Sequence, residues 1–328
     1  MSATRKGRFG ALLFSLLACV AVLTGIPSHA QKQPKIGVTL AGSPPDRFAE
    51  KLRTGLAEHG WVEGKNIIIE YRYASGQSER YAGFMQEFVK LRVDVIVAGG
   101  GTPAATAAQR ATSSIPIVVP LMADPIGSGL VRSLARPGGQ LTGISLMMSE
   151  TSGKRVEILR EAFPTLKRVA VLLDPTTDYG QISATQAAAV SHGFSLKVVR
   201  ARSAEELEMA FDQAAKSGAQ AMIVLTSSML NANRRRIVQL VERNRMVGIY
   251  ENRLYVEAGG LLSYGTDVAD LYRVSAKYVD RILRGARVGE LPIEQPTKFE
   301  LLVNLRTARL LGIELPRSLL LRADQIVE

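Results

Sequence analysis

The chain has 328 residues, of which 46% are hydrophobic and 22% are charged. This composition excludes a disordered or fibrous protein, and the length allows two domains. The formal net charge is +11, but the densest basic run, Arg234-Arg235-Arg236, has no aromatic residues interleaved with it. The charge therefore does not indicate nucleic-acid binding.

The first 30 residues are predicted to be a secretory signal peptide. A short basic start precedes an uncharged apolar run over 11–26, and Ser28-His29-Ala30 fits a cleavage site. The run is shorter than the roughly 20 residues that span a bilayer, which favours cleavage over a membrane anchor. Cys19, the only cysteine, lies in a loose match to a lipoprotein site, but apolar sequence continues beyond it. We expect an exported, periplasmic protein without disulfides, with lipid anchoring at Cys19 as the less favoured alternative.

Strands and helices alternate through the first half of the remaining chain. The strands are short and apolar and are bounded by Gly and Pro, which is typical of a parallel sheet covered on both faces. The predicted strands are 35–40, 67–73, 93–98 and 115–120, and the predicted helices are 48–59, 78–91 and 103–111.

The second half repeats this order. Strands are predicted at 169–173, 196–200, 221–225 and 247–250. A helix stops at His192-Gly193, another begins at Ser203 with Glu206 as a capping box, and a third covers 231–244. Six elements in matching order favour an internal duplication, with two sheets facing a cleft. The tail predicts a strand at 261–264, an amphipathic helix at 268–284 and a strand at 299–303.

Residue patterns of catalytic and metal sites are missing from the sequence. His59 and His192 each precede a helix-ending glycine, where a basic residue suits the helix dipole, and they lie far apart in the chain. Gly99-Gly100-Gly101-Thr102 lacks the spacing of a dinucleotide or phosphate-binding loop. We expect no metal, no cofactor and no catalytic residue, so the chain is not expected to be an enzyme.

Residues that directly follow parallel strands share one edge of a sheet. Here they combine small hydroxyl residues and helix starts, which suit a carboxylate, with acidic residues that suit an ammonium group. Tyrosines at the same edge can pack against a ring, so the set fits a zwitterionic amino acid. For Asp174, which precedes a proline, a turn-capping role is an equal alternative. The candidate ligand-binding residues are Ser43, Gly101, Thr102, Pro103, Asp124, Asp174, Tyr179, Thr226, Ser227, Tyr250 and Glu251.

Several longer segments resemble a known family. They are GTPAA at 101–105, ADPIGSGLVRSLARPGGQLTGIS at 123–145, SGKRVEILREAFPTLKRVAVLLDP at 152–175, IYENRLYVEAGGLLSYGTDVADLYR at 249–273 and LPIEQPTKFELLVNLRTARLLGIELP at 291–316. They are similar to the ABC-transporter substrate-binding proteins associated with tryptophan and tyrosine uptake, and the likeness extends over about 35–328.

The resemblance implies an α/β type I periplasmic-binding-protein fold, in which two Rossmann-like lobes with parallel-dominated sheets are joined by a hinge. After the signal peptide at 1–30, lobe 1 would comprise 31–145 plus 262–296, and lobe 2 would comprise 146–261 plus 297–328. The family's binding positions would include Thr102, Asp124, Thr226 and Glu251.

The expected function is an extracytoplasmic solute receptor of an ABC importer. It would bind a small amino-acid-like ligand, an aromatic amino acid being favoured, by hinge closure, and deliver it as a monomer to a membrane permease. A ligand-sensing subunit of a membrane signalling protein is the alternative, because its fold and pocket would be identical. A transcriptional regulator of this fold would need a DNA-binding segment where this chain has its export signal, and a hydrolase would need a nucleophile or base that the sequence does not place.

Overall fold

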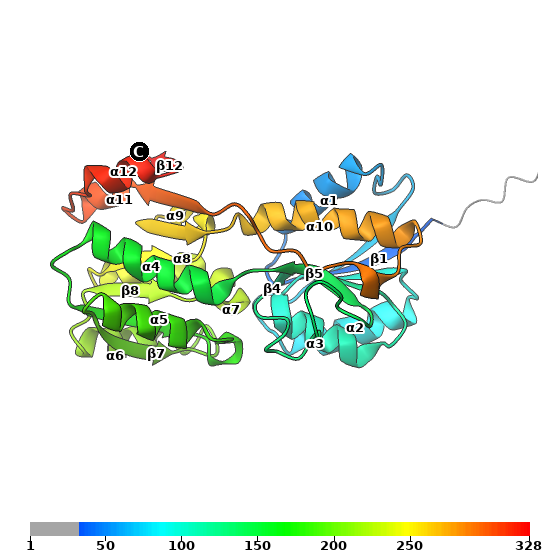
Figure 1. The fold of residues 1–328 in the computed structure, drawn as a ribbon, viewed down its shortest axis with the longest axis horizontal. Coiled ribbons are helices and arrows are strands. Elements are labelled where there is room, and N and C mark those ends of the chain that lie inside the picture. Colours follow the sequence, from blue (N-terminus) through cyan, green and yellow to red (C-terminus); the bar gives the residue numbers. More distant parts are fainter. Residues whose placement is uncertain (1–32) are drawn as a thin grey trace, which may run out of the picture. The chain divides into compact units, whose positions relative to one another are not determined.

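The computed structural model describes residues 33–328, which form two α/β lobes (Figure 1). Each sheet carries a hydrophobic core on both of its faces. The predicted architecture of two lobes with parallel-dominated sheets is confirmed. The predicted signal peptide and Cys19 lie outside the described residues. Within residues 33–328, no helix has the length and apolar character needed to cross a membrane.

The first lobe is built on a five-stranded parallel sheet with the order β2-β1-β3-β4-β5. Helices α1 and α10 pack on one face, and α2 and α3 pack on the other. The strands are β1 (Lys35–Leu40), β2 (Ile68–Tyr73), β3 (Val95–Ala98), β4 (Ile117–Met122) and β5 (Leu141–Ser145). The helices are α1 (Arg47–Glu58), α2 (Arg80–Lys90), α3 (Gly101–Ala111) and α10 (Val268–Leu283).

The second lobe is built on a seven-stranded sheet with the order β12-β11-β10-β9-β8-β6-β7. Only the β10–β11 pair is antiparallel. The strands are β6 (Arg168–Leu173), β7 (Ser195–Arg200), β8 (Ala221–Val224), β9 (Val247–Tyr250), β10 (Leu262–Gly265), β11 (Glu300–Asn304) and β12 (Gln325–Val327). The order of β7-β6-β8-β9-β10 repeats that of β2-β1-β3-β4-β5, as an internal duplication predicts.

Eight helices pack against this second sheet. On one face lie α4 (Met148–Ala162), α5 (Gln181–Ser191), α11 (Leu305–Leu310) and α12 (Arg317–Arg322). On the other lie α6 (Leu207–Lys216), α7 (Ser228–Ala232), α8 (Arg234–Arg243) and α9 (Arg253–Glu257). Two short 3₁₀ helices, η1 (Pro175–Thr177) and η2 (Val288–Glu290), complete the described elements.

Strand β10 changes the expected boundary between the lobes. The sequence placed 262–296 with the first lobe, but β10 pairs with β9 and β11 in the second sheet. The pairing of β10 with β9 and β11 extends no further than Gly265. The chain therefore leaves the second lobe there and continues as α10, which packs in the first lobe. We propose lobe limits of 33–145 plus 266–296 for the first lobe, and 146–265 plus 297–328 for the second.

Two helices of the second lobe begin or end differently from the prediction. The helix expected from Ser203 begins at Leu207, and the Glu206 carboxylate instead accepts a hydrogen bond from the Arg202 N–H at 2.9 Å. The helix expected over 231–244 is divided into α7 and α8 at Asn233, whose side chain donates to the Met229 carbonyl at 2.9 Å. In both places a polar side chain bonds to nearby backbone and competes with the helix.

The contact between α1 and α10 supplies a test of how tightly the first lobe is packed. A methyl group added at Gly55 of α1 would lie 2.2 Å from the Arg273 carbonyl oxygen of α10. We expect Gly55→Ala to lower the free energy of unfolding by about 1–3 kcal/mol, because a backbone atom cannot rotate away. Denaturant unfolding measures this difference.

Gly83 of α2 is the matched control, because nothing lies within 4 Å of an added methyl group there. Gly83→Ala is expected to raise the free energy of unfolding by about 0.5–1 kcal/mol, since alanine is the better helix former. Equal shifts in the two variants would contradict close packing of α1 against α10.

Candidate functional site

A pocket lies between the two lobes, at the carboxyl ends of strands from both sheets. About 480 Å³ of atom-free space, counting the open solvent at its mouth, lies among its lining atoms. The first lobe contributes Gly101, Thr102, Pro103, Leu121 and Ala123, and the crossing segments contribute Leu146, Met148 and Val268. The second lobe contributes Thr177, Tyr179, Thr226, Ser227, Ser228, Asn231, Glu251 and Asn252.

Seven of the eleven candidate ligand-binding residues come together in this pocket. They reach it because β3, β6, β8 and β9 end on that side of the sheets, as the strand-end argument predicted. They are Gly101, Thr102, Pro103, Tyr179, Thr226, Ser227 and Glu251.

The other four candidates lie elsewhere. The exposed Ser43 donates its hydroxyl to Ser75, and Asp124 accepts the Gly127 N–H at 2.8 Å. Tyr250 is buried and stacks on Tyr255 with ring centroids 4.8 Å apart, because the last residue of β9 points into the core. The structure brings none of Ser43, Asp124, Asp174 and Tyr250 to the pocket lining.

Asp174 has the capping role that was the alternative for it. Its carboxylate accepts the Thr176 N–H at 2.9 Å at the start of η1. It also accepts the Ser227 hydroxyl at 2.7 Å. Ser227 in turn accepts the Met229 and Leu230 N–H groups at the start of α7. Asp174 therefore fixes the side chain of the pocket residue Ser227 but does not itself line the pocket.

The eleven candidates leave out several lining residues. Ser228 and Asn252 directly follow pocket residues at the ends of β8 and β9, so they share the strand-end position of the candidates. Leu146 and Met148 follow β5, a strand that the sequence did not predict. Its five residues, LTGIS, show little alternation of apolar and polar side chains and include a glycine. Val268 is part of the pocket lining because α10 begins beside the cleft.

Gln181 holds the loop that follows β8. Its side-chain oxygen accepts the Thr226 N–H at 2.8 Å, and its side-chain nitrogen donates to the Thr226 carbonyl at 3.0 Å. Gln181 is itself completely buried on α5. These two hydrogen bonds restrain the backbone of Thr226, a residue that lines the pocket.

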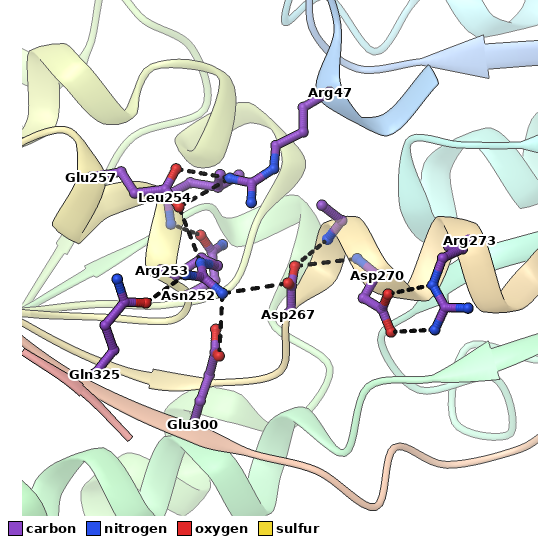
Figure 2. Close-up of polar contacts among 11 residues, drawn as sticks. Arg47, Asn252, Arg253, Leu254, Glu257, Asp267, Asp270, Arg273, Glu300 and Gln325 are labelled. Atoms are coloured by element: carbon purple, nitrogen blue, oxygen red, sulfur yellow. Dashed lines mark hydrogen bonds and ion pairs between the residues drawn. The ribbon is translucent and has the colours of Figure 1, made fainter. Parts of the chain in front are cut away.

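The two lobes touch across the mouth of the pocket. Ser228 Oγ of the second lobe donates to the Gly100 carbonyl of the first lobe at 3.2 Å. Arg47 of α1 pairs with Glu257 of α9 at 2.8 Å (Figure 2). Both side chains of this ion pair are more than one-third exposed, so it contributes at most about 1 kcal/mol to closure.

Arg253 connects two of the crossing segments beside this ion pair. Its guanidinium lies 3.6 Å from the Asp267 carboxylate and 3.4 Å from that of Glu300 (Figure 2). Asp267 also caps the N-terminus of α10 through the Ala269 and Asp270 N–H groups. The crossings at 266–267 and 297–300 are therefore linked through one side chain of the second lobe.

Glu251 is the buried carboxylate of the pocket. Burial raises its pKa to about 7. The charge of Arg155, a hydrogen bond from the Thr226 side chain and the Ser227 backbone N–H oppose this rise. Near neutral pH this carboxylate can therefore hold a negative charge or a proton, depending on what lies beside it.

Comparisons with known proteins agree on one family. The model of the family described as "ABC transporter substrate binding protein" matches residues 35–327. The "Tyrosine-binding protein" of Clostridioides difficile (strain R20291) is 25% identical over 292 residues, which cover 88% of this chain and 83% of that protein.

Two solved structures are similar over nearly all of the described chain. A conserved domain protein from Vibrio cholerae O1 biovar eltor has a TM-score of 0.84 and 28% identity, covering 90% of this chain and 100% of that one. An ABC domain in complex with L-Trp from Streptococcus pneumonia has a TM-score of 0.82 and 26% identity, again covering 90% and 100%.

Proposed function

The chain belongs to the family of ABC transporter substrate-binding proteins, and from this premise we propose that it is the extracytoplasmic receptor of an importer for an aromatic amino acid. The pocket between the lobes carries the proposal, because it combines a helix start, a buried carboxylate and an apolar wall. A zwitterion with an apolar side chain needs these three features together.

The carboxylate of the ligand would bind at the start of α3. Gly101, Thr102 and Pro103 line the pocket there, and the first turn of a helix presents unpaired N–H groups and a partial positive charge. Ser228 reaches the same place from the opposite lobe, where it bonds to Gly100. Because the single hydroxyl proton of Ser228 is engaged by the Gly100 carbonyl, the Thr102 hydroxyl and the helix N–H groups are the donors for an anion here.

The ammonium group of the ligand would bind at Glu251. This is the acidic side chain of the pocket lining, and it is 7% exposed. A charge-assisted hydrogen bond between an ammonium group and a buried carboxylate is stronger than a bond between neutral groups. The ring would pack against Leu121, Leu146, Met148 and Val268, with Tyr179 beside it.

The two lobes would close on the ligand because both of them contact it. Residues of both lobes line the pocket, so a ligand that touches both sides stabilises the closed arrangement more than an open one. The names of two relatives, a tyrosine-binding protein and a structure with bound L-Trp, support an aromatic ligand. Export to the periplasm, a monomeric state and delivery to a membrane permease complete the proposed role.

Thermal unfolding of the chain from Gln31 onward measures the ligand class. We expect tryptophan, tyrosine or phenylalanine to raise the melting temperature by several degrees. A ligand at about 100 times its dissociation constant stabilises the folded state by about 2.7 kcal/mol. Alanine, lysine and aspartate should leave the melting temperature unchanged, because they cannot fill the apolar wall.

Thr102→Val is the site variant of this experiment, and Val190→Thr is its control on a side chain that is 79% exposed. The Thr102 variant should reduce the shift without lowering the melting temperature of the free protein by more than a few degrees. A shift with an aliphatic amino acid and none with the three aromatic ones would reject the proposed ligand class.

A further inference from the structure

Arg155 is a buried charge with few partners. It lies on α4 and is 1% exposed. Its Nη2 donates to the hydroxyl oxygens of Thr151 and Ser152, both at 3.3 Å. Its Nε and Nη1 have no hydrogen-bond partner among residues 33–328. A guanidinium in this position is strongly unfavourable unless an opposite charge lies close to it.

Glu251 is an acidic residue next to this group, and it is connected to Arg155 through Thr151, with no direct ion pair or hydrogen bond between the two charged side chains within residues 33–328. Burial lowers the pKa of Arg155 to about 10, and the charge of Glu251 opposes this lowering. The converse holds at Glu251, where Arg155 is the foremost influence that favours the ionised carboxylate. Thr151, which accepts a hydrogen bond from Arg155, lines a small cavity together with Glu251 and Thr226.

Glu251 therefore has two sides. One side faces the ligand pocket, whose lining includes it, and the other faces the small cavity beside Thr151. Arg155 is not among the residues that line the ligand pocket. An effect of Arg155 on a ligand must accordingly pass through Glu251.

Several other titratable groups lie near this pair. Tyr255 of α9 faces both charges, and burial raises its pKa well above its usual value, so it stays protonated. Tyr264 of β10 faces Arg155, and Arg234 of α8 faces Tyr255. Asp174, behind Ser227, is hydrogen-bonded to Thr176 and Ser227. The residues contributed by the first lobe and by α10 to the pocket carry no titratable side chain.

We propose that Arg155 is a positioning residue that holds the Glu251 carboxylate ionised beneath the pocket, so that this carboxylate can receive the ammonium group of an amino acid. The inference rests on the proposed function for its ligand. Arg155 does not line the pocket, so its guanidinium and the ammonium group of the ligand need not touch each other.

The titration of Glu251 without ligand tests the coupling directly. Carboxyl-labelled glutamate is followed by carbon NMR from pH 5 to pH 9, and Glu251→Gln identifies the signal. Arg155→Met should raise the titration midpoint of Glu251 by at least one pH unit, whereas Arg155→Lys should keep it close to that of the unmodified protein. An unchanged midpoint in Arg155→Met would overturn the proposal. If that variant does not fold, Arg155→Gln gives the same comparison, because it removes the charge but keeps a polar side chain beside Thr151 and Ser152.

The pH profile of ligand affinity tests the consequence. In the unmodified protein, affinity for the aromatic ligand should fall by up to about tenfold per pH unit below the midpoint. In Arg155→Met, affinity should be about five- to tenfold weaker between pH 6 and pH 7, and the deficit should shrink toward pH 8.5. Arg155→Lys should restore the profile. A deficit of equal size at every pH would show a purely structural role and overturn the proposal.

The two measurements separate the two proposals. If no amino acid binds the unmodified protein, the proposed function fails. The NMR midpoint of Glu251 still decides whether Arg155 governs the charge of that carboxylate.

Discussion

Replacing Glu251 by glutamine is expected to weaken the binding of an aromatic amino acid by about 30- to 1000-fold. Removing one partner of a buried charged pair costs about 2–4 kcal/mol, because the other charge is left without compensation, and about 1.4 kcal/mol corresponds to a tenfold change. Glutamine keeps the shape and the hydrogen bonds with Thr226 and Ser227 but carries no charge. Isothermal titration calorimetry measures the change.

Glu257→Gln is the matched control for this substitution. Glu257 is also a glutamate of the second lobe, but its side chain is 41% exposed, and it pairs with Arg47 across the mouth. Its loss should change affinity by no more than a few-fold. If Glu251→Gln bound the ligand as tightly as the Glu257 variant does, Glu251 would not be the ammonium site.

The same substitution should change how the stability of the ligand-free protein depends on pH, in addition to a pH-independent loss from leaving the buried Arg155 charge without Glu251. The folded-state pKa of Glu251 is raised from 4.5 to about 7, so folding favours the protonated form. Its contribution to stability is fully present below pH 4.5 and is lost as the pH rises through 7. The stability of Glu251→Gln relative to the unmodified protein should therefore rise between pH 5 and pH 8, by up to about 3 kcal/mol. A stability difference independent of pH would contradict the raised pKa.

Replacing Gly265 by alanine is expected to be the most damaging single methyl addition near the site. The added carbon would lie 1.9 Å from the Glu251 carbonyl oxygen, and main-chain atoms cannot move aside by rotating a side chain. The end of β10 and the loop after β9 would have to separate, at a cost of about 3 kcal/mol. Because Glu251 moves with its backbone, ligand affinity should fall together with stability.

Urea unfolding and calorimetry of the folded fraction measure these two effects. Gly153→Ala, on α4 of the same lobe, is the control, because the nearest atom to its added methyl group is 3.9 Å away. That variant should be as stable as the unmodified protein or slightly more so. Normal affinity in folded Gly265→Ala would show that the position of Glu251 does not depend on this close approach.

Local patterns in the sequence were sufficient to predict most strands and helices. Short apolar runs located β1, β3, β6, β8 and β9 to within a few residues. Segment α4 was not predicted because its buried face includes Thr151, Ser152 and Arg155, which weaken the apolar periodicity. The same polar residues are the ones that connect α4 to the site.

The two-lobed α/β plan and the strand ends that carry Thr102, Thr226 and Glu251 could be predicted from the amino-acid sequence, because periodicity and strand polarity are properties of neighbouring residues. The folded chain was needed to show that Tyr250 points into the core while Glu251 faces the pocket, that β10 belongs to the second sheet, and that Leu146, Met148 and Val268 line the cleft. It was also needed to show that Arg155 of α4 is buried. These arrangements depend on contacts between segments far apart in the chain, and burial, which sets the charge of Glu251, exists only once those segments have packed together.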